Sequence, residues 1–309
     1  MGLLNPLVTV LMPIYNGEKY LVEAIESVLN QTFANFELLI LNDDSTDNSL
    51  NIIKSFNDDR INLVENNHNI GLTATLNEGI KLARGKYIAR LDQDDLMKKE
   101  RLSLQIGYLE NHYNIILLGS GVEYIDHKGD LLYKQKMPIH HKKIENHFPI
   151  GNPFVHSSVI FDKKSVMDIS GYNGKFIYAQ DYDLWLRLSL VGKVHNLPDL
   201  LTINRIHNNQ ETTNSEIHDI RIKEKIIIIK QIIIHNNTNK KAKTTGYMKL
   251  SILYLMRKDY KSFYYYLLIV LKNFPYIIIS AKTYKLIKNY YKNKMYMRRA
   301  LKKQKEGSY

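Results

Sequence analysis

Three carboxylates crowd into four positions of the stretch YIARLDQDDLM, which covers residues 87–97. Asp92, Asp94 and Asp95 follow an apolar run that is typical of a buried strand. Carboxylates are hard oxygen ligands suited to Mg²⁺ or Mn²⁺, and these ions also bind substrate phosphates. The pair Asp92 and Asp94, spaced D-x-D, can therefore share one ion and leave open positions for a diphosphate. The alternative is an acidic loop that only faces water.

Other polar residues that could take part in binding or catalysis lie near the ends of expected strands and helices. Asp43 could accept a hydrogen bond from a nucleobase N–H or a ribose hydroxyl, or it could serve a turn. The flat ring of Tyr15 could stack on a nucleobase or pack as an ordinary tyrosine. Asp181 lies near an expected helix start, where a carboxylate is either electrostatically favoured or a general base. For the isolated His156 and His207, a structural role is the simpler interpretation.

The first hundred residues alternate apolar runs with segments of helical spacing. This pattern predicts a mostly parallel sheet with helices on both faces, that is, an α/β fold. Ligands bind beyond the carboxyl ends of the strands in such sheets, and three polar clusters fall there: residues 13–18, 42–47 and 92–95. The expected strands are 7–12, ended by Pro13, then 36–41, 61–66 and 86–91.

Local signals set the expected helix ends. Thr46 or Asp47 is expected to cap a helix that runs through Phe56. Gly85 is expected to end the helix that starts after Gly71.

The middle of the chain is less regular. Residues 134–150 are polar and rich in histidine, which indicates a loop that could close over a ligand. The remaining expected elements are helices at 98–112 and 179–192 and strands at 115–126, 152–161 and 200–207.

Composition narrows the function classes. The chain has 309 residues, of which 44% are hydrophobic, enough for one large domain or one domain with an appendage. There is no cysteine, which excludes disulfides, thiolate nucleophiles and cysteine metal sites. The N-terminal residues lack the pattern of a secretory signal, so we expect a cytoplasmic protein.

Charge is distributed unevenly along the chain. Residues 1–215 carry 21 Lys/Arg and 26 Asp/Glu, whereas residues 216–309 carry 22 Lys/Arg and only 5 Asp/Glu. This basic segment mixes Ile, Tyr, Leu and Lys, which favours helices that lie on an anionic membrane surface. Its apolar windows are too short to span a bilayer. The alternatives are packing on the rest of the chain or on a second subunit as a homo-oligomer. A nucleic-acid role is not expected, because no recognisable motif accompanies the charge.

Taken together, these motifs resemble the family 2 glycosyltransferases, which have the GT-A fold. The resemblance covers roughly residues 5–208, in the right order. It implies a GT-A domain at 1–215, with a nucleotide-sugar half at about 1–112 and an acceptor half at about 113–215. Residues 216–309 would then be a basic helical extension. The matching segments include VTVLMPIYNGEKYL, LILNDDSTDNS, NIGLTATLNEGIKLARGKYIARLDQDDL, NPFVHSSVIF, AQDYDLWLRL and LPDLLTINRIH.

The resemblance also implies roles for individual residues. Asp181 matches the aspartate of the family's "ED" motif, the expected catalytic base. Asp92 and Asp94 match the D-x-D motif that holds a divalent metal (Mn²⁺ or Mg²⁺) and the diphosphate, and His207 matches a late histidine that completes the metal site in some members. Asp95 matches the acid that commonly follows the D-x-D motif. The expected nucleotide-sugar-binding residues are Pro13, Tyr15, Glu18, Asp43, Asn77, Asp92 and Gln93.

Three departures from the family pattern bear on these roles. Asn42 and Asp44 stand where the common text is D-D-G, which affects base or ribose contacts. Thr75 replaces a frequent arginine, so one diphosphate contact is missing. Gln180 replaces the glutamate of "ED" and leaves Asp181 as the charged candidate there.

The function implied is inverting transfer of a sugar, usually from a UDP-sugar, to a glycan or lipid-linked acceptor. The Ile/Lys/Asn-rich composition hints at bacterial cell-surface polysaccharide synthesis at the inner face of the membrane. Two rivals remain. A sugar nucleotidyltransferase should carry a Gly-rich triphosphate loop near the first strand, which is absent from the sequence. Only an activity assay distinguishes a glycosyltransferase from a non-catalytic nucleotide-sugar-binding module.

Overall fold

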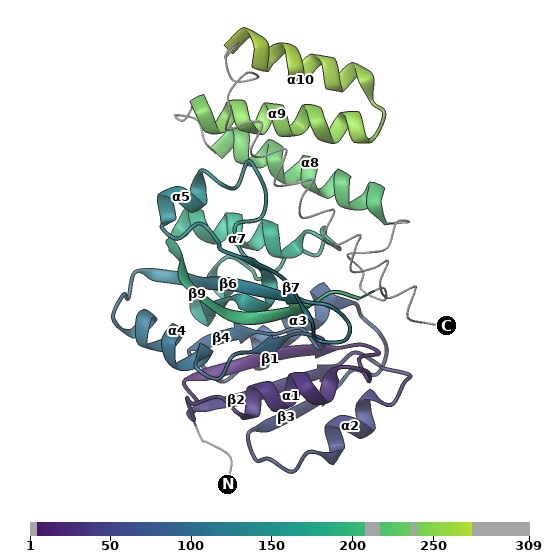
Figure 1. Cartoon of the computed structure of the whole chain (residues 1–309), viewed down its shortest axis with the longest axis vertical. Coiled ribbons are helices and arrows are strands. Elements are labelled where there is room, and N and C mark those ends of the chain that lie inside the picture. The colour runs from purple at the N-terminus through teal and green to yellow at the C-terminus, as the bar shows by residue number, and fades with distance from the viewer. Residues whose placement is uncertain (1–4, 208–216, 236–239, 274–309) are drawn as a thin grey trace. The chain divides into compact units, whose positions relative to one another are not determined.

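In the computed structural model, whose helices and strands are labelled in Figure 1, the chain divides into two compact units. Unit 1 contains residues 1–124, 134–144 and 153–205, and unit 2 contains residues 125–133, 145–152 and 206–309. Within these units the structure describes residues 5–207, 217–235 and 240–273. The domain boundary expected at residue 215, and the division of the first domain into two halves, stay predictions.

Four parallel strands form the first half of the sheet in unit 1, in the order β3-β2-β1-β4. In this register Val8 lies opposite both Phe36 and Tyr87. Every residue of β1 and β2 is buried, as expected for strands covered on both faces. The four strands are β1 (Val8–Ile14), β2 (Phe36–Asn42), β3 (Ile61–Glu65) and β4 (Tyr87–Arg90).

Helices between these strands cover the two faces of the sheet. The even-numbered residues of β1, such as Val10 and Met12, pack in one core with the buried faces of α1, α2 and α4. Leu11 points to the opposite face, where α3 approaches so closely that a Cβ on Gly79 would lie 2.3 Å from Leu11 Cδ1. Glycine at this position therefore lets the helix sit on the strand. The helices are α1 (Leu21–Leu29), α2 (Ser49–Ser55), α3 (Leu72–Leu82) and α4 (Arg101–Glu110).

The sheet continues beyond β4 in the order β8-β6-β9-β5. The pairs β4 with β8, β8 with β6, and β5 with β9 are antiparallel. This extension brings β9 beside the segment that follows β4. The further strands are β5 (Leu96–Met97), β6 (Ile115–Ile125), β7 (Leu131–Gln135), β8 (Ile160–Asp162) and β9 (Lys193–Arg205). The further helices are α5 (His141–Glu145), a 3-10 turn (His156–Ser158), α6 (Lys163–Asp168) and α7 (Gln180–Val191).

The expectation that β1 ends at Pro13 was wrong. The strand continues to Ile14, with Pro13 paired opposite Leu41. Odd-numbered residues of β1 bond toward β4, as the N–H of Leu91 donates to the carbonyl of Leu11 (3.2 Å). Because β4 has ended by the level of Pro13, the missing N–H of the proline leaves no partner strand unsatisfied.

Other boundaries also differ from expectation. The expected strand at 152–161 is instead the 3-10 turn followed by the short β8, and the expected loop at 134–150 contains α5. α3 ends at Leu82, and Gly85 serves another purpose. A Cβ on Gly85 would lie 2.4 Å from the backbone nitrogen of Thr9, so glycine is needed for the close approach to β1.

Unit 2 contains the helices α8 (His218–His235), α9 (Lys240–Met256) and α10 (Tyr260–Asn273). A Cβ on Gly246 of α9 would lie 2.7 Å from Ile233 of α8, which places the two helices in close contact. The rings of Tyr254 and Tyr266 stack at 5.5 Å between α9 and α10. Asp219 joins the start of α8 to Arg257 by an ion pair of 2.7 Å.

No helix within the described residues has the length and apolar character needed to cross a membrane.

Candidate active site

The loops that follow β1 and β2 are tied together at the carboxyl edge of the sheet. Asn16 adopts a left-handed φ of 51°, which asparagine tolerates better than most residues. Its backbone N–H donates to Ser45 Oγ (3.1 Å), and its Oδ1 accepts from the N–H of Thr46 (2.8 Å). These bonds hold the predicted nucleotide-binding segment 13–18 against the polar cluster 42–47.

Glu18 has a clear partner in the second loop. Its Oε2 accepts from the N–H of Asn48 (2.9 Å), and its own N–H donates to Asp47 Oδ2 (3.0 Å). Burial raises the pKa of Asp47, but hydrogen bonds from Ser49 and Glu18 outweigh it, so the pKa lies below its ordinary value. The N-cap of α2 was expected at Thr46 or Asp47, but Asn48 occupies this position. Asp47 still accepts a hydrogen bond from the N–H of Ser49 (3.0 Å). Nucleotide binding by Glu18 stays a prediction.

Gln93 connects the D-x-D segment to the first loop. Its Oε1 accepts from the backbone N–H of Tyr15 (2.8 Å), and its Nε2 donates to the carbonyl of Tyr15 (3.0 Å). The amide group is thus used for positioning. The side chain of Tyr15 is 47% exposed, which leaves its ring accessible for stacking. Pro13 is buried within β1.

Asp43 is buried at the end of β2 and holds the loop before α3. Its Oδ1 accepts from Asn66 Nδ2 (2.7 Å) and from the N–H of Ile70 (2.9 Å). Its Oδ2 accepts from the N–H of Gly71 (2.9 Å), a residue with a φ of 83°. Three protein donors therefore fix this carboxylate, and its contact with a nucleobase stays a prediction.

The side-chain amide of Asn77 on α3 makes two hydrogen bonds to the backbone of Tyr172. Its Nδ2 donates to the carbonyl of Tyr172 (2.9 Å), and its Oδ1 accepts from the N–H of Tyr172 (2.8 Å). The preceding Gly171 has a φ of 65°, and a Cβ there would lie 2.5 Å from Asn77 Oδ1. The described role of Asn77 is therefore to position Tyr172, and binding of the nucleotide sugar by Asn77 stays a prediction.

Asp92 is held from two directions. Arg90, which is fully buried, donates to Asp92 Oδ1, and Ser157 Oγ donates to Asp92 Oδ2 (2.7 Å). The backbone N–H of Asp92 donates to Ser157 Oγ (3.1 Å). Burial raises the pKa of Asp92, but the Arg90 charge and the Ser157 hydrogen bond outweigh it, so the pKa lies below its ordinary value. Asp92 is therefore ionised, with one third of its side chain (33%) exposed.

Asp94 and Asp95 occupy different environments. Asp94 is half-buried, whereas Asp95 is buried and bonded to β9. Asn204 Nδ2 donates to Asp95 Oδ2 (2.7 Å), and the N–H of Arg205 donates to Asp95 Oδ1 (3.0 Å). Burial raises the pKa of Asp95 well above its ordinary value, and the charges of Asp94 and Asp92 add to this. If all three acids were ionised they would repel one another, because they stand within four residues.

The carboxylates of Asp92 and Asp94 are suitable ligands for a divalent cation that also binds a phosphate. Carboxylate oxygens are the ligands that Mg²⁺ and Mn²⁺ prefer, and a cation would relieve the repulsion among the three acids. Among the described residues, no group of three His, Asp or Glu side chains is arranged to hold an ion by itself. The chain would therefore supply Asp92 and Asp94, and the substrate would supply further oxygens.

His207 is buried and lies in unit 2, whereas Asp92 and Asp94 lie in unit 1. Its role as a metal ligand stays a prediction.

Asp181 stands in the first turn of α7, directly after Gln180. Its Oδ1 accepts from the N–H of Tyr182 (2.7 Å), which fixes the carboxylate at the helix N-terminus. The macrodipole of the helix favours the ionised form there. Gln180 is buried, and its Oε1 has no hydrogen-bond partner among the described residues.

The phenol of Tyr172 relates Asp181 to the D-x-D segment. Burial raises the pKa of Tyr172 far above its ordinary value, with Arg90 opposing this effect and both Asp181 and Asp92 adding to it. The same relation follows from contacts: Ser157 bonds to Asp92, the adjacent His156 bonds to Tyr172 Oη, and both rings pack on Trp185, one turn after Asp181 on α7. The fold therefore brings together acids from the end of β4 and from the start of α7.

His156 was interpreted from the sequence as isolated, but it belongs to this neighbourhood. Its Nε2 shares a hydrogen bond with Tyr172 Oη (2.8 Å), and both rings pack edge-on against Trp185. Burial lowers the pKa of His156 to about 3, with Arg90 adding to this effect and Asp92 opposing it. The imidazole is therefore neutral at physiological pH.

Sequence reasoning missed Arg90, Ser157 and Tyr172. An arginine inside the apolar run YIARL was a detectable signal, because a charged side chain in a buried strand needs a partner. The serine and the tyrosine had no such signal, since their contacts depend on the tertiary fold.

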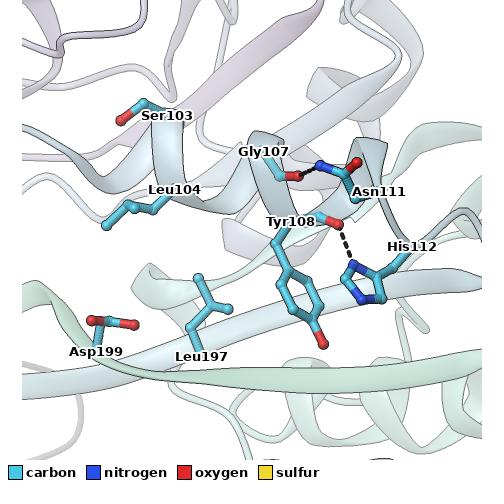
Figure 2. Close-up of a pocket in the computed structure, with 8 residues that line it drawn as sticks. All are labelled: Ser103, Leu104, Gly107, Tyr108, Asn111, His112, Leu197 and Asp199. Atoms are coloured by element: carbon cyan, nitrogen blue, oxygen red, sulfur yellow. Dashed lines mark hydrogen bonds between the residues drawn. The ribbon is translucent and has the colours of Figure 1, made fainter.

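A separate cavity of about 380 Å³ lies between α4 and β9 in unit 1 (Figure 2). The ring of Tyr108 stacks on His112 at 4.1 Å and on His195 at 4.9 Å, while Leu197 and Asp199 come from β9. None of the sequence-predicted site residues lines this cavity.

A parallel sheet with clustered acids beyond its carboxyl edge is the arrangement of an α/β protein that binds its ligand at that edge. Residues 9–169, just over half of the chain, match the family model "Glycosyl transferase family 2". The chain belongs to this family, as the sequence motifs predicted.

Three relatives illustrate the similarity. An uncharacterized glycosyltransferase of Haemophilus influenzae is 33% identical over 223 residues, covering 67% of this chain and 68% of that protein. The putative glycosyltransferase EpsE of Bacillus subtilis is 36% identical over 203 residues, covering 64% and 72%. The amylovoran biosynthesis glycosyltransferase AmsE of Erwinia amylovora is 33% identical over 198 residues, covering 62% and 74%.

Two solved structures share the fold. S. aureus TarS in complex with UDP-GlcNAc aligns with a TM-score of 0.62 at 18% identity, covering 80% of this chain and 71% of that chain. The mannosyltransferase PcManGT of Pyrobaculum calidifontis, in complex with GDP-Man and Mn²⁺, aligns with a TM-score of 0.62 at 16% identity, covering 96% and 86%. The predicted GT-A fold, an α/β sheet with a helical C-terminal extension, is confirmed.

The two bonds between Asn77 and Tyr172 lead to a stability prediction. Asn77→Ala leaves the N–H and the carbonyl of Tyr172 without these partners, so the free energy of unfolding should fall by about 2 kcal/mol. Asn111→Ala is the matched control, because its exposed amide makes one bond of 2.7 Å to the carbonyl of Gly107. Urea unfolding followed by tryptophan fluorescence measures both. Equal losses in the two variants would contradict the positioning role.

Proposed function

We propose that this chain transfers a sugar from a nucleotide-sugar donor, a UDP-sugar, to a hydroxyl of a glycan or lipid-linked acceptor, with inversion at the anomeric carbon. The observation that carries the proposal is the chain of contacts from Asp92 through Ser157 and His156 to Trp185 of α7, which stands one turn after Asp181. This contact path supports Asp181 as a base that would act near the acids proposed to hold the donor. The similarity to AmsE, an amylovoran biosynthesis glycosyltransferase, supports a role in polysaccharide synthesis.

The donor would bind at the carboxyl edge of the sheet. The exposed ring of Tyr15 offers a surface for the nucleobase, and Asp43 and Glu18 border the same edge. Asp92 and Asp94 would hold Mn²⁺ or Mg²⁺ together with the diphosphate. The bound ion supplies positive charge that stabilises the departing nucleoside diphosphate. The complexes of TarS with UDP-GlcNAc and of PcManGT with GDP-Man and Mn²⁺ support both the donor class and the ion.

The chemistry is a single displacement. Asp181 accepts the proton of the acceptor hydroxyl while the acceptor oxygen forms a bond to the anomeric carbon. The bond from that carbon to the diphosphate oxygen breaks, and the nucleoside diphosphate leaves. Attack from the opposite face gives inversion without a covalent sugar–enzyme intermediate. The neutral His156–Tyr172 pair beside the acids adds no charge to this environment.

Asp181→Asn tests the assignment of the base. The amide cannot take up the proton, so release of nucleoside diphosphate should fall by about 100- to 10,000-fold. Binding of UDP, measured by calorimetry with Mn²⁺, should stay unchanged. The matched control is Asp199→Asn, an exposed aspartate on β9.

Near-normal turnover of Asp181→Asn would remove Asp181 from the role of base. Nucleotide binding without any turnover in the unmodified protein, across UDP-, GDP- and TDP-sugars, would favour a non-catalytic binding module. Release of inorganic pyrophosphate from a nucleoside triphosphate and a sugar phosphate would favour a nucleotidyltransferase.

We also infer that unit 2 places the enzyme on the cytoplasmic face of an anionic membrane, where a lipid-linked acceptor would be found. On α10, four exposed residues recur at helical spacing, namely Tyr260, Tyr264, Leu268 and Leu271, with exposures of 56%, 59%, 63% and 40%. Spacings of three and four residues put them on one face. The basic charge of residues 216–309 complements anionic lipid headgroups. An interfacial helix of this kind needs no membrane span.

Vesicle binding tests this placement. Replacing Tyr264 and Leu268 together by serine removes two apolar side chains from the face, so affinity for vesicles rich in phosphatidylglycerol should fall by about tenfold or more. Tyr113→Ser is the matched control, since Tyr113 is 81% exposed but lies in unit 1.

Equal vesicle binding by the double variant and the unmodified protein would contradict the membrane face. Loss of a dimer in the double variant, measured by light scattering without vesicles, would instead assign the face to self-association.

A further inference from the structure

Asp92 is bonded to residues that lie far apart in the sequence. Arg90 stands two positions before it on β4, whereas Ser157 belongs to the 3-10 turn that precedes β8. Both partners are fully buried, although one third of the Asp92 side chain is exposed. The two buried groups therefore fix a carboxylate whose remaining surface faces outward.

Ser157 engages both the side chain and the main chain of Asp92. Its hydroxyl donates to Oδ2 (2.7 Å) and accepts from the N–H of Asp92 (3.1 Å). The Ser157 hydroxyl thus acts as both donor and acceptor toward Asp92. Rotation of the Asp92 carboxylate would break the bond from Ser157 and the ion pair with Arg90 together.

Arg101 fixes the backbone under these two partners. Its guanidinium donates to the carbonyls of Ser157 (2.5 Å), Arg90 (3.0 Å) and Val159 (2.9 Å). Gln105, one turn further on α4, donates to the carbonyl of Ser158 (2.9 Å). α4 therefore joins the segment that carries Arg90 to the segment that carries Ser157.

The acceptors of these hydrogen bonds distinguish residues that support the fold from residues that support the site. Arg101 and Gln105 bond to backbone carbonyls, as a structural network does. Arg90 and Ser157 also bond to the Asp92 carboxylate at the ligand edge of the sheet. A buried guanidinium is costly to desolvate, and its pairing with Asp92 offsets that cost only while the geometry is kept. The same pairing fixes the direction of the carboxylate.

We propose that Arg90 and Ser157 are positioning residues, which hold the Asp92 carboxylate in its donor-binding orientation before the donor arrives. The proposal rests on the proposed function, because it takes Asp92 as a donor- and metal-binding residue. A group that is held in place loses less conformational freedom on binding, so the affinity for the metal–nucleotide complex is higher. Residues that orient metal ligands commonly change affinity by about 10- to 100-fold when they are replaced.

Two adjacent serines provide a matched pair of variants. Ser157→Ala removes both hydroxyl bonds to Asp92. Ser158→Ala also removes a fully buried hydroxyl from the same 3-10 turn, but that hydroxyl donates to the carbonyl of Val155 (2.8 Å) and does not contact Asp92. The comparison therefore separates positioning of Asp92 from general support of the turn.

The readouts are calorimetric binding of UDP and of GDP in the presence of Mn²⁺, and the midpoint of urea unfolding. Ser157→Ala should weaken nucleotide binding and raise the Mn²⁺ concentration for half-saturation, each by about 10-fold or more. Ser158→Ala should bind as the unmodified protein does. Ser157→Cys retains a weak donor and should restore part of the affinity.

The outcomes distinguish this proposal from the proposed function. If the unmodified protein binds neither nucleotide with Mn²⁺, the proposed function fails and the positioning role fails with it. If the unmodified protein binds but Ser157→Ala and Ser158→Ala bind equally well, only the positioning role is overturned. Weakening of both variants in proportion to their loss of stability would also overturn it.

Discussion

Mutual repulsion among three carboxylates within four residues is the constraint on which the site depends. The chain meets it by giving each acid a different environment. Asp92 is paired with the buried Arg90, Asp95 is bonded to β9 through Asn204 and Arg205, and Asp94 is half-buried. The antiparallel extension of the sheet is therefore part of the site, because β9 supplies the partners that allow Asp95 to be buried.

Side chains that bond to backbone groups hold the loops at the carboxyl edge of the sheet in place. Asp43 holds the loop before α3, Asn77 holds Tyr172, and Gln93 joins the D-x-D segment to Tyr15. Backbone groups at strand ends lack ladder partners, and buried ones must be satisfied elsewhere. Several residues expected to contact the nucleotide thus also shape the loops that surround it. Residues proposed to bind the nucleotide and residues that support the loops therefore lie in the same short segments.

Local patterns predicted much of the fold. The run of apolar strands and amphipathic helices up to residue 97 predicted the parallel half of the sheet, and the D-x-D spacing located the acids at its edge. Pro13 and Gly85 were misinterpreted, because strand pairing at Ile14 and the close approach to Thr9 are tertiary effects. Ser157 could not be found from spacing, since the distance in sequence to Asp92 carries no signal. The 3-10 turn that presents it was expected to be a strand.

We propose that acids from the end of β4 and the start of α7 act on opposite sides of one sugar. A crystal structure with a non-reacting UDP-sugar analogue and Mn²⁺ tests it most directly. We expect a diphosphate bound with the ion at Asp92 and Asp94, and an anomeric carbon whose open face points to Asp181. A nucleotide bound away from these acids, such as in the cavity between α4 and β9, would contradict it.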